Sequence, residues 1–351
     1  MPSHVAHLLF AEEAIARSDR AGELTRILDA PANAYLVLGA QGPDIFYHNQ
    51  RRRPSGLAYG SLMHRRGYGT AVANMWVRAR AIGAGAWATA WIIGFATHAV
   101  LDRHAHPYIN SRSGWPQQGK PETDRFRSMH AFLERLIDVE LLRRTRDMHP
   151  NDLEFFERVS CADEPPSEWV DLVAYGLRET YTKAAEDAQL VERLRGAFLD
   201  AMGYYRFTSR VDAEYLEKGL AREESGEIGP RWLSIVHPPE VPPDLDVLNE
   251  AHEEWPHPCS IEDRRTASFL DCYEDAVDEA ASMIDTMVGS WEAEPAEGRA
   301  VIEAAVKNWN LSDGRPTQWP CPKHHSAPLP LPELQARMRE SIRRGDGGRL
   351  P

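Results

Sequence analysis

The longest apolar stretch of the chain covers residues 81–97, AIGAGAWATAWIIGFAT, and ligating side chains follow it at regular intervals. His98 comes next, and Asp102 and His106 each lie four residues further on. Side chains four residues apart share one face of an α-helix. The pattern therefore predicts a buried helix over residues 81–106 with three potential metal ligands along one edge.

A membrane-spanning helix is the main alternative for this stretch, because about 18 or more consecutive apolar residues are typical of one. The run is rich in Ala and Gly rather than Leu, and it contains Gly83, Gly85 and Gly94. It also leads directly into ionisable side chains, which are costly within a bilayer. No second comparable run occurs in the sequence. We therefore expect a buried core helix and no transmembrane segment.

Helical periodicity continues along most of the chain. Ser3 is expected to cap an N-terminal amphipathic helix, and residues 126–147 carry apolar side chains at helical spacing. Pro107 and the loop 113–121 are expected to end the helix that carries His106. Further helices are predicted over residues 56–80, with an interruption near Gly67, and over 151–159, 167–188, 189–207 and 264–291.

The predicted fold class is all-α, because neither an internal repeat nor a convincing set of alternating strands is present. We expect one multi-helix domain over residues 1–310. Within it, residues 220–262 are rich in Pro, Gly and acidic residues, and they read as a long irregular connection near the opening of the site. Residues 311–351 form a Pro-rich tail. Its segment 332–344 is expected to be a short helix, and its last residues, GDGGRLP, to be disordered.

Charge is distributed unevenly along the 351 residues, whose net charge is −13. Residues 41–80 contain seven Arg and one acid, whereas residues 241–300 contain sixteen acids and three Arg. The overall acidity argues against general affinity for nucleic acid, so no stable nucleic-acid complex is expected. The basic run 51–53 is typical of a solvated loop, and the arginines of residues 51–66 are expected to attract an anionic substrate.

The N-terminus lacks the basic segment, apolar core and cleavage site of a secretory signal. The four cysteines form no CxxC pair, so neither a disulfide framework nor a zinc ribbon is expected. Cys321 lies near His324 and His325, which reads as incidental clustering in the tail. These features predict a cytoplasmic protein with reduced cysteines.

Eight of the fourteen histidines lie within the first 130 residues. Together with carboxylates at compatible positions they give eight candidate metal ligands: His7, Asp44, His64, His98, Asp102, His106, His130 and Glu134. Imidazole nitrogen and carboxylate oxygen suit zinc. One tetrahedral ion needs four ligands, so eight imply two or three ions. The lack of thiolates favours a catalytic site over a structural one.

Taken singly, several of these candidates have ordinary explanations. Asp44 follows a Gly-Pro break and suits a helix cap, and His130 with Glu134 suits a surface pair on a helix. His7 has His4 as a neighbour and competitor for any ligand role. The histidines at 237, 252 and 257 read as loop residues rather than ligands.

The order of these segments resembles the zinc-dependent phospholipase C family, whose fold and trinuclear site are also similar to those of single-strand-specific zinc nucleases. The matching segments are HLLFAEEAI, LGAQGPDIF, GSLMH, GFATHAVLDRHAHPYIN and MHAFLERLIDVELL, which together cover roughly residues 1–145. The resemblance implies a single α-helical domain that hydrolyses phosphodiester bonds, commonly of phospholipids.

The resemblance also implies a distribution of ligands over three ions. The first ion takes Asp44, His64, His98 and Asp102; the second takes His106, His130 and Glu134; the third takes His7, with Asp102 bridging. Secreted relatives separate the bridging Asp from the next His by five residues, whereas three lie between Asp102 and His106. His104 therefore stays a rival to His106.

The implied reaction is in-line attack on a phosphodiester by water activated at the metal site, with Asp44 as a metal ligand and candidate general base. The expected substrate is a small anionic phosphodiester or phospholipid head group, reached by peripheral membrane contact. Two alternatives stay open: a phosphodiesterase similar to the single-strand nucleases, and a helical protein that binds metal without turnover.

Overall fold

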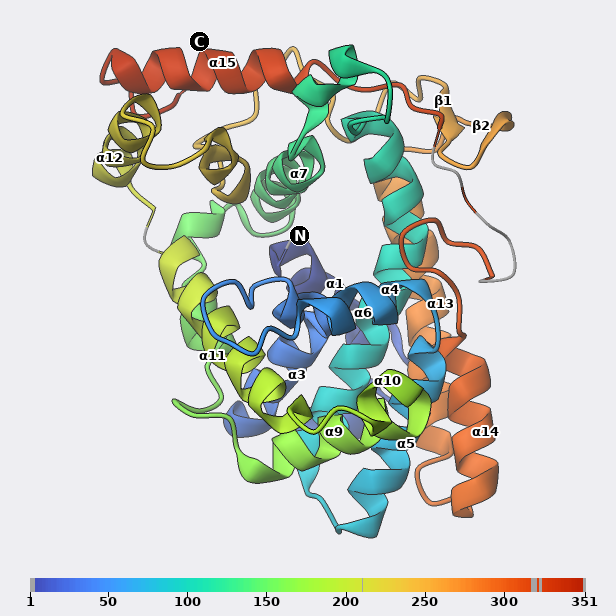
Figure 1. Ribbon diagram of the computed structural model, residues 1–351. Helices are drawn as coiled ribbons and strands as arrows, with labels where there is room; N and C mark the ends of the chain where they lie inside the picture. The colour runs from blue at the N-terminus through green and yellow to red at the C-terminus, as the bar shows by residue number, and fades with distance from the viewer. Residues whose placement is uncertain (1–3, 210, 317–320, 322–323, 350–351) are drawn as a thin grey trace.

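The computed structural model of the protein describes residues 4–209, 211–316, 321 and 324–349 (Figure 1). Its α-helices are α1 (His4–Arg17), α2 (Ala21–Ile27), α3 (Ala30–Ala40), α4 (Leu57–Arg65), α5 (Tyr68–Ala81), α6 (Ala86–Ser113), α7 (Met129–Arg146), α8 (Phe155–Val159), α9 (Ser167–Thr180), α10 (Thr182–Ala185), α11 (Leu190–Thr208), α12 (Ala213–Glu224), α13 (Phe269–Gly289), α14 (Pro295–Val306) and α15 (Leu331–Arg343). Short 3₁₀ turns are η1 (Gly42–Phe46), η2 (Pro121–Phe126), η3 (Pro150–Asp152) and η4 (Pro230–Ile235). The all-α prediction is confirmed.

The long helix α6 lies at the centre of the molecule and packs most extensively against α3. Two glycines allow this contact. A Cβ on Gly39 of α3 would lie 2.4 Å from Trp91 O, and one on Gly94 of α6 would lie 2.3 Å from Leu36 O. Because the two backbones touch, the end of α3 lies beside the middle of α6.

Helix α6 was expected to end at Pro107. It instead continues to Ser113. Proline removes one backbone donor and leaves the carbonyl four residues earlier without its helix partner. That carbonyl belongs to Arg103, and Gly314 packs so closely on it that a Cβ would lie 2.3 Å away. Asn110 donates to Ser312 O at 2.7 Å. Tertiary contacts with the loop 310–316 therefore stabilise the helix beyond the proline.

Other boundaries differ from the expectations in instructive ways. Helix α13 begins at Phe269 rather than at residue 264, because Ser268 and Asp271 form a capping box there. Residues 264 and 265 instead belong to a small antiparallel hairpin, β1 (Trp255–His257) and β2 (Ser260–Arg265), which was not predicted. Helices α12 and α14 were missed, and the expected helix 167–188 is divided into α9 and α10. The predicted cap Ser3 lies outside the described residues.

The segment 220–262 contains the end of α12, the turn η4 and the strand β1. It packs against the two long helices that carry most candidate ligands. His237 lies 2.8 Å from Asp138 of α7, and Tyr108 of α6 donates to Val247 O. The segment therefore covers the outer sides of α6 and α7.

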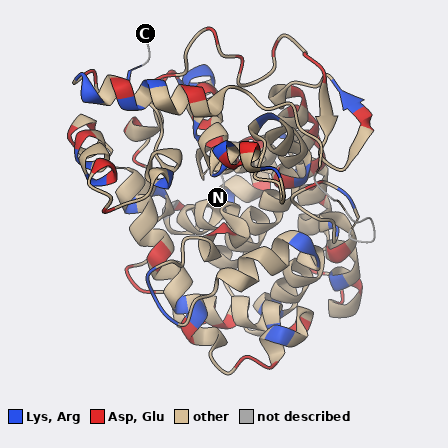
Figure 2. Ribbon diagram, turned by 45° about the horizontal axis from the view of Figure 1, so that its top comes forward, with Lys and Arg blue, Asp and Glu red and all other residues tan. Residues whose placement is uncertain are grey.

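The C-terminal helix α15 confirms the prediction over residues 332–344 and runs across one end of the molecule beside α12 (Figure 1). Opposite charges alternate along α15 in Figure 2, and two of its arginines pair with α12: Arg339 with Glu223 and Arg343 with Glu224. Residues 345–349, expected to be disordered, form turns after the helix. The division of the chain at residue 310 stays a prediction.

A disulfide joins Cys259, in the turn of the hairpin, to Cys321, with 4.8 Å between the two Cα atoms. The expectation that no disulfide forms was therefore wrong. The two cysteines are 62 residues apart, and only the tertiary fold brings them within bonding distance. A metal site on Cys321 is excluded because its sulfur is in the disulfide. The cysteine-based argument for a reducing compartment falls, and the cytoplasmic location stays a prediction.

In the part of the chain that the structure describes, each helix is too short or too polar to cross a bilayer. This finding agrees with the prediction that residues 81–97 belong to a buried core helix.

Candidate metal centre

The eight predicted residues converge on one buried region from five elements. Helix α6 supplies His98, Asp102 and His106 along one edge, as predicted. The others come from α1, η1, the end of α4 and α7: His7, Asp44, His64, His130 and Glu134. Residues that lie up to 127 positions apart in the sequence thus meet in space.

Asp102 lies at the middle of the cluster, among four imidazole rings. Its Oδ2 atom lies 3.1 Å from His98 Nε2, 3.4 Å from His64 Nε2 and 3.5 Å from His106 Nδ1. Its Oδ1 atom lies 3.4 Å from His7 Nε2. A carboxylate with both oxygens among imidazole nitrogens is placed to bridge two cations.

Two further carboxylates complete groups on either side. Asp44 Oδ1 lies 3.2 Å from His64 Nε2, and Asp44 Oδ2 lies 3.8 Å from His98 Nε2. On the other side, Glu134 Oε1 lies 3.0 Å from His130 Nε2 and 3.6 Å from His106 Nε2. The groups Asp44, His64, His98 and His106, His130, Glu134 each have a spacing compatible with one metal ion, as does His7, His98, Asp102.

The geometry distinguishes between the rival histidines. His104 points away from the cluster and lies 2.7 Å from Glu279 of α13, whereas His106 lies beside Glu134. His4 lies in a separate buried network, where Arg135 contacts its Nδ1 at 2.7 Å. His106 and His7 are therefore the members of the cluster.

Backbone carbonyls orient three of the rings. His64 Nδ1 lies 2.8 Å from Gly60 O, His98 Nδ1 lies 3.1 Å from Ala40 O, and His106 Nδ1 lies 2.9 Å from Leu311 O. A ring that donates its Nδ1–H to a carbonyl keeps its Nε2 lone pair for a cation, which is the usual arrangement of metal-binding histidines. The side chains are thus held in a ligating orientation by the fold itself.

A glycine brings Asp44 to the rings. Gly42 has a φ of +54°, a left-handed conformation that glycine adopts without steric cost. A Cβ at this position would lie 2.2 Å from Cγ of His98. Both the turn and the close approach to His98 therefore require glycine two residues before Asp44.

Buried polar atoms of the cluster lack hydrogen bonds among the described residues. They are His7 Nδ1, both oxygens of Asp44, His98 Nε2, Asp102 Oδ2 and Glu134 Oε2. Buried polar atoms without partners are rare and costly in proteins, so each calls for an explanation. Four of these six atoms, the two oxygens of Asp44, His98 Nε2 and Asp102 Oδ2, lie in the close contacts described above. Nitrogen and oxygen donors in this number fit zinc ions.

A family model described as zinc dependent phospholipase C matches residues 6–186. The match covers more than half of the 351 residues and includes all eight residues of the cluster. The chain belongs to the zinc-dependent phospholipase C family. No curated protein and no solved structure matched. Family membership and the clustered ligands together support a metal-dependent, phospholipase-like function.

Neighbouring imidazole groups favour the charged form of the three carboxylates in the cluster. Burial alone would raise the pKa of Asp102, but the charges of His106 and His98 outweigh burial and hold its pKa well below the usual value. The pKa of Asp44 is lowered in the same way, against the effect of burial, by His98 and His64. Glu134 follows the pattern, because His130 and His106 lower its pKa despite burial. Three buried anions therefore attract cations to this region.

Exposure to solvent within the cluster is greatest at His130. The side chain of His130 is 30% exposed, whereas no other member of the cluster exceeds 8%. Burial lowers the pKa of His130, which favours its neutral, ligating form. His130 is therefore the member of the cluster that is most accessible from solvent.

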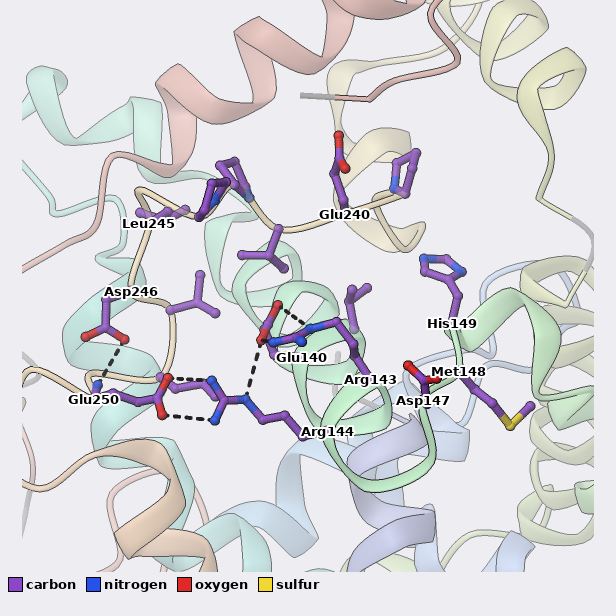
Figure 3. Close-up of a pocket in the computed structure, with 17 residues that line it drawn as sticks. Glu140, Arg143, Arg144, Asp147, Met148, His149, Glu240, Leu245, Asp246 and Glu250 are labelled. Atoms are coloured by element: carbon purple, nitrogen blue, oxygen red, sulfur yellow. Dashed lines mark hydrogen bonds and ion pairs between the residues drawn. The ribbon is translucent and has the colours of Figure 1, made fainter. Parts of the chain in front are cut away.

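A cavity of about 770 Å³ lies apart from the metal centre, at the far end of α7, and is lined on its other side by the loop 239–250 (Figure 3). Arg144 spans it, paired with both Glu140 and Glu250. None of the eight predicted residues lines this cavity. It carries no argument for phospholipase C chemistry.

A second buried network borders the centre and was missed in the sequence. Asp138 accepts a hydrogen bond from the backbone of Ala6 at 2.8 Å and lies 2.8 Å from His237, expected to be a loop residue. Arg135 contacts both Asp138 and His4. Because Arg135 neighbours Glu134 and Ala6 neighbours His7, this network fixes α1 against α7 at the cluster. Arg135 Nη1 lies 2.7 Å from His4, 3.2 Å from Asp138 and 3.4 Å from His237, so a positive charge already lies among these three side chains.

Proposed function

We propose that the protein hydrolyses phosphodiesters of the phospholipid type at a zinc centre held by the eight clustered residues. The observation that carries the proposal is the convergence of four imidazole rings on Asp102. On either side lie Asp44 and Glu134, of which both Asp44 oxygens and Glu134 Oε2 have no hydrogen bond within the described part of the chain. Zinc at such a site supplies two effects: it lowers the pKa of bound water and neutralises negative charge on the phosphoryl oxygens.

The ligand assignment follows the three groups. Asp44, His64 and His98 hold one ion with Asp102, and His106, His130 and Glu134 hold a second. His7 and the bridging Asp102 hold the third. The ion count and each of these roles belong to the proposal.

Asp44 is the candidate general base. Its carboxylate is buried, and His98 and His64 hold its pKa below the usual value against the effect of burial. An unprotonated oxygen in this position accepts a proton from attacking water. The rings of His64 and His98 fix the direction in which the carboxylate points.

Apolar side chains on the inner side exclude bulk water. Ile109, Ile137 and Phe269 form the wall of a small cavity of about 20 Å³ behind Asp102 and Glu134. Water is excluded from such a wall, and electrostatic attraction is stronger in its low dielectric. The opening at His130 then receives the phosphate of a phospholipid in peripheral contact with a membrane surface.

The experiment measures metal content and turnover together. Purified protein is expected to contain two or three zinc ions per chain by mass spectrometry of the elements, and to release diacylglycerol from phosphatidylcholine vesicles. Removal of metal with a chelator should abolish turnover, and added zinc should restore it. Asp102→Ala should lose both zinc and turnover, since four rings depend on that carboxylate.

Specific results would overturn the proposal. A well-folded protein that binds no metal removes its basis, and metal binding without hydrolysis of any phosphodiester points to a non-catalytic metal protein. Cleavage of single-stranded DNA in preference to phospholipid would assign the centre to the nuclease alternative, which the net charge of −13 disfavours.

A further inference from the structure

A cavity of about 530 Å³, which we call the arginine pocket, lies beside the metal centre between α11, α12, η4 and the turn 48–52. Its volume is within the range of small-molecule sites. The proposed reaction makes no use of it.

The pocket is strongly cationic. Four arginines line it, at positions 51, 52, 222 and 231, against one carboxylate, Asp200. Arg52 pairs with Asp200, and Arg222 pairs with Glu227. Arg51 and Arg231 are exposed and have no ion-pair partner among the described residues. Two guanidinium groups are therefore available to a ligand.

The turn that carries Arg51 is fixed in advance. Asp200 Oδ2 accepts backbone hydrogen bonds from Arg51 at 3.0 Å and Arg52 at 2.9 Å, and a third from Asn49 Nδ2 at 2.9 Å. A binding group on a preorganised turn loses less conformational entropy when a ligand arrives. The backbone that carries Arg51 and Arg52 is therefore held in place by Asp200 before a ligand binds.

Aromatic rings form the remaining walls. Phe207, Tyr215 and Trp232 line the pocket from three elements, and Tyr204 stacks on His48 with 3.9 Å between ring centres. His48 is 93% buried, and its Nδ1 has no hydrogen bond among the described residues. Such walls suit a ligand with an apolar face next to its charge.

His48 also connects the pocket to the metal centre. It follows Asp44 by four residues, and its backbone N–H lies 3.4 Å from Asp44 O. Tyr205, the residue after Tyr204 on α11, is buried and packs edge-on against His48 with 5.3 Å between ring centres. A ligand in the pocket therefore adjoins the residue proposed as general base.

We propose that the arginine pocket binds a second phosphate of the substrate, carried on a head group with an apolar face, while the phosphodiester to be cleaved lies at the metal centre. The inference rests on the proposed function. It narrows the substrate class to phosphodiesters that carry a second phosphate group. Arg51 and Arg231 supply the charge-assisted hydrogen bonds that recognise the phosphate. The aromatic rings contact the carrier.

The test compares two lipids that differ by one phosphate, phosphatidylinositol 4-phosphate and phosphatidylinositol, each in phosphatidylcholine vesicles. The wild-type protein is expected to cleave the phosphorylated lipid with a kcat/KM about 10-fold or more above that of the other, the effect of losing a charge-assisted hydrogen bond. The double variant Arg51→Gln/Arg231→Gln should bring this ratio close to one. A ratio near one for the wild type, or an unchanged ratio in the variant, overturns the inference.

The control is Arg195→Gln. Arg195 lies on α11, which forms one wall of the pocket, but it is exposed and does not line the pocket, so this variant removes one nearby positive charge without touching the site. The ratio should stay at the wild-type value. A fall equal to that of the double variant would mean that net charge alone drives the preference, and would overturn a specific pocket.

Direct binding separates this inference from the proposed function. Calorimetry with soluble inositol 1,4-bisphosphate and the zinc-loaded protein should detect a site that the double variant weakens about 10-fold or more. If neither lipid is cleaved but this site is present, the proposed function fails and the pocket stands. If lipids are cleaved but wild type and double variant bind the probe equally, the pocket fails and the proposed function stands.

Discussion

For single residues, the structure distinguishes His106 from its neighbour His104 as the candidate metal ligand, and this distinction can be tested. His106 lies 3.6 Å from Glu134 in the metal cluster, whereas His104, two residues earlier, pairs with Glu279 outside it. We predict that His106→Ala loses zinc and lowers kcat/KM at least about 100-fold, because even supporting groups of a metal site cost up to this much. His104→Ala serves as the control and should retain zinc and activity.

The measurement is zinc content per chain together with phosphodiester turnover for both variants. Equal losses in the two would show that the helix rather than the ligand was disturbed. Loss only in His104→Ala would reverse the assignment that the geometry favours.

Five of the eight candidate residues could be found in the sequence by helical spacing, whereas His7, Asp44 and His64 were assigned through the family resemblance. His98, Asp102 and His106 share an edge by period, and so do His130 and Glu134. The sequence did not reveal the residues whose role depends on distant partners. Gly42 allows close approach to His98, His48 stacks on Tyr204, and Asp138 accepts a hydrogen bond from Ala6.

At the element scale, the contact between α3 and α6 is the feature on which the cluster depends. A Cβ on Gly94 would lie 2.3 Å from the backbone oxygen of Leu36, and backbone cannot yield as a flexible side chain does. We predict that Gly94→Ala destabilises the protein by about 1–3 kcal/mol, the range for overpacked cores. It should also lower zinc occupancy, because separation of the helices moves Asp44 from His98.

The matched control is Gly203→Ala in α11, where a Cβ would meet nothing within 4 Å. Alanine is favoured over glycine within a helix, so this variant should be stabilised by up to about 1 kcal/mol. Urea unfolding of both variants provides the measurement. Equal stability of the two would contradict a close α3–α6 contact.

Elements with strong periodicity were predictable, and those whose ends depend on tertiary contacts were not. Helix α7 lies within the predicted range, and α15 ends within a residue of it. The continuation of α6 through Pro107 could not be foreseen, because it depends on Gly314 and Ser312 from another part of the chain. The hairpin β1–β2 is short and its pairing includes an irregular register, so no alternating pattern marked it.

In the molecule as a whole, residues 311–313 from the C-terminal part of the chain pack against the N-terminal part, which contains the candidate ligands. Leu311 accepts the hydrogen bond of His106 and donates one to His64 O, so one residue contacts two candidate ligands. Asp313 O lies 3.1 Å from His257 Nε2 in the hairpin. The disulfide between Cys259 and Cys321 then ties the C-terminal part of the chain to the same hairpin.

The disulfide closes 62 residues of chain, and the entropy that it removes from the unfolded state corresponds to about 4 kcal/mol. We predict that Cys259→Ser/Cys321→Ser lowers the free energy of unfolding by an amount of this order, measured in urea without reductant. Reductant should lower the stability of the wild type towards that of the variant and leave the variant unchanged. Cys161 and Cys272 are free, so an effect of reductant on the double variant would mean that another pair forms and would contradict the pairing described.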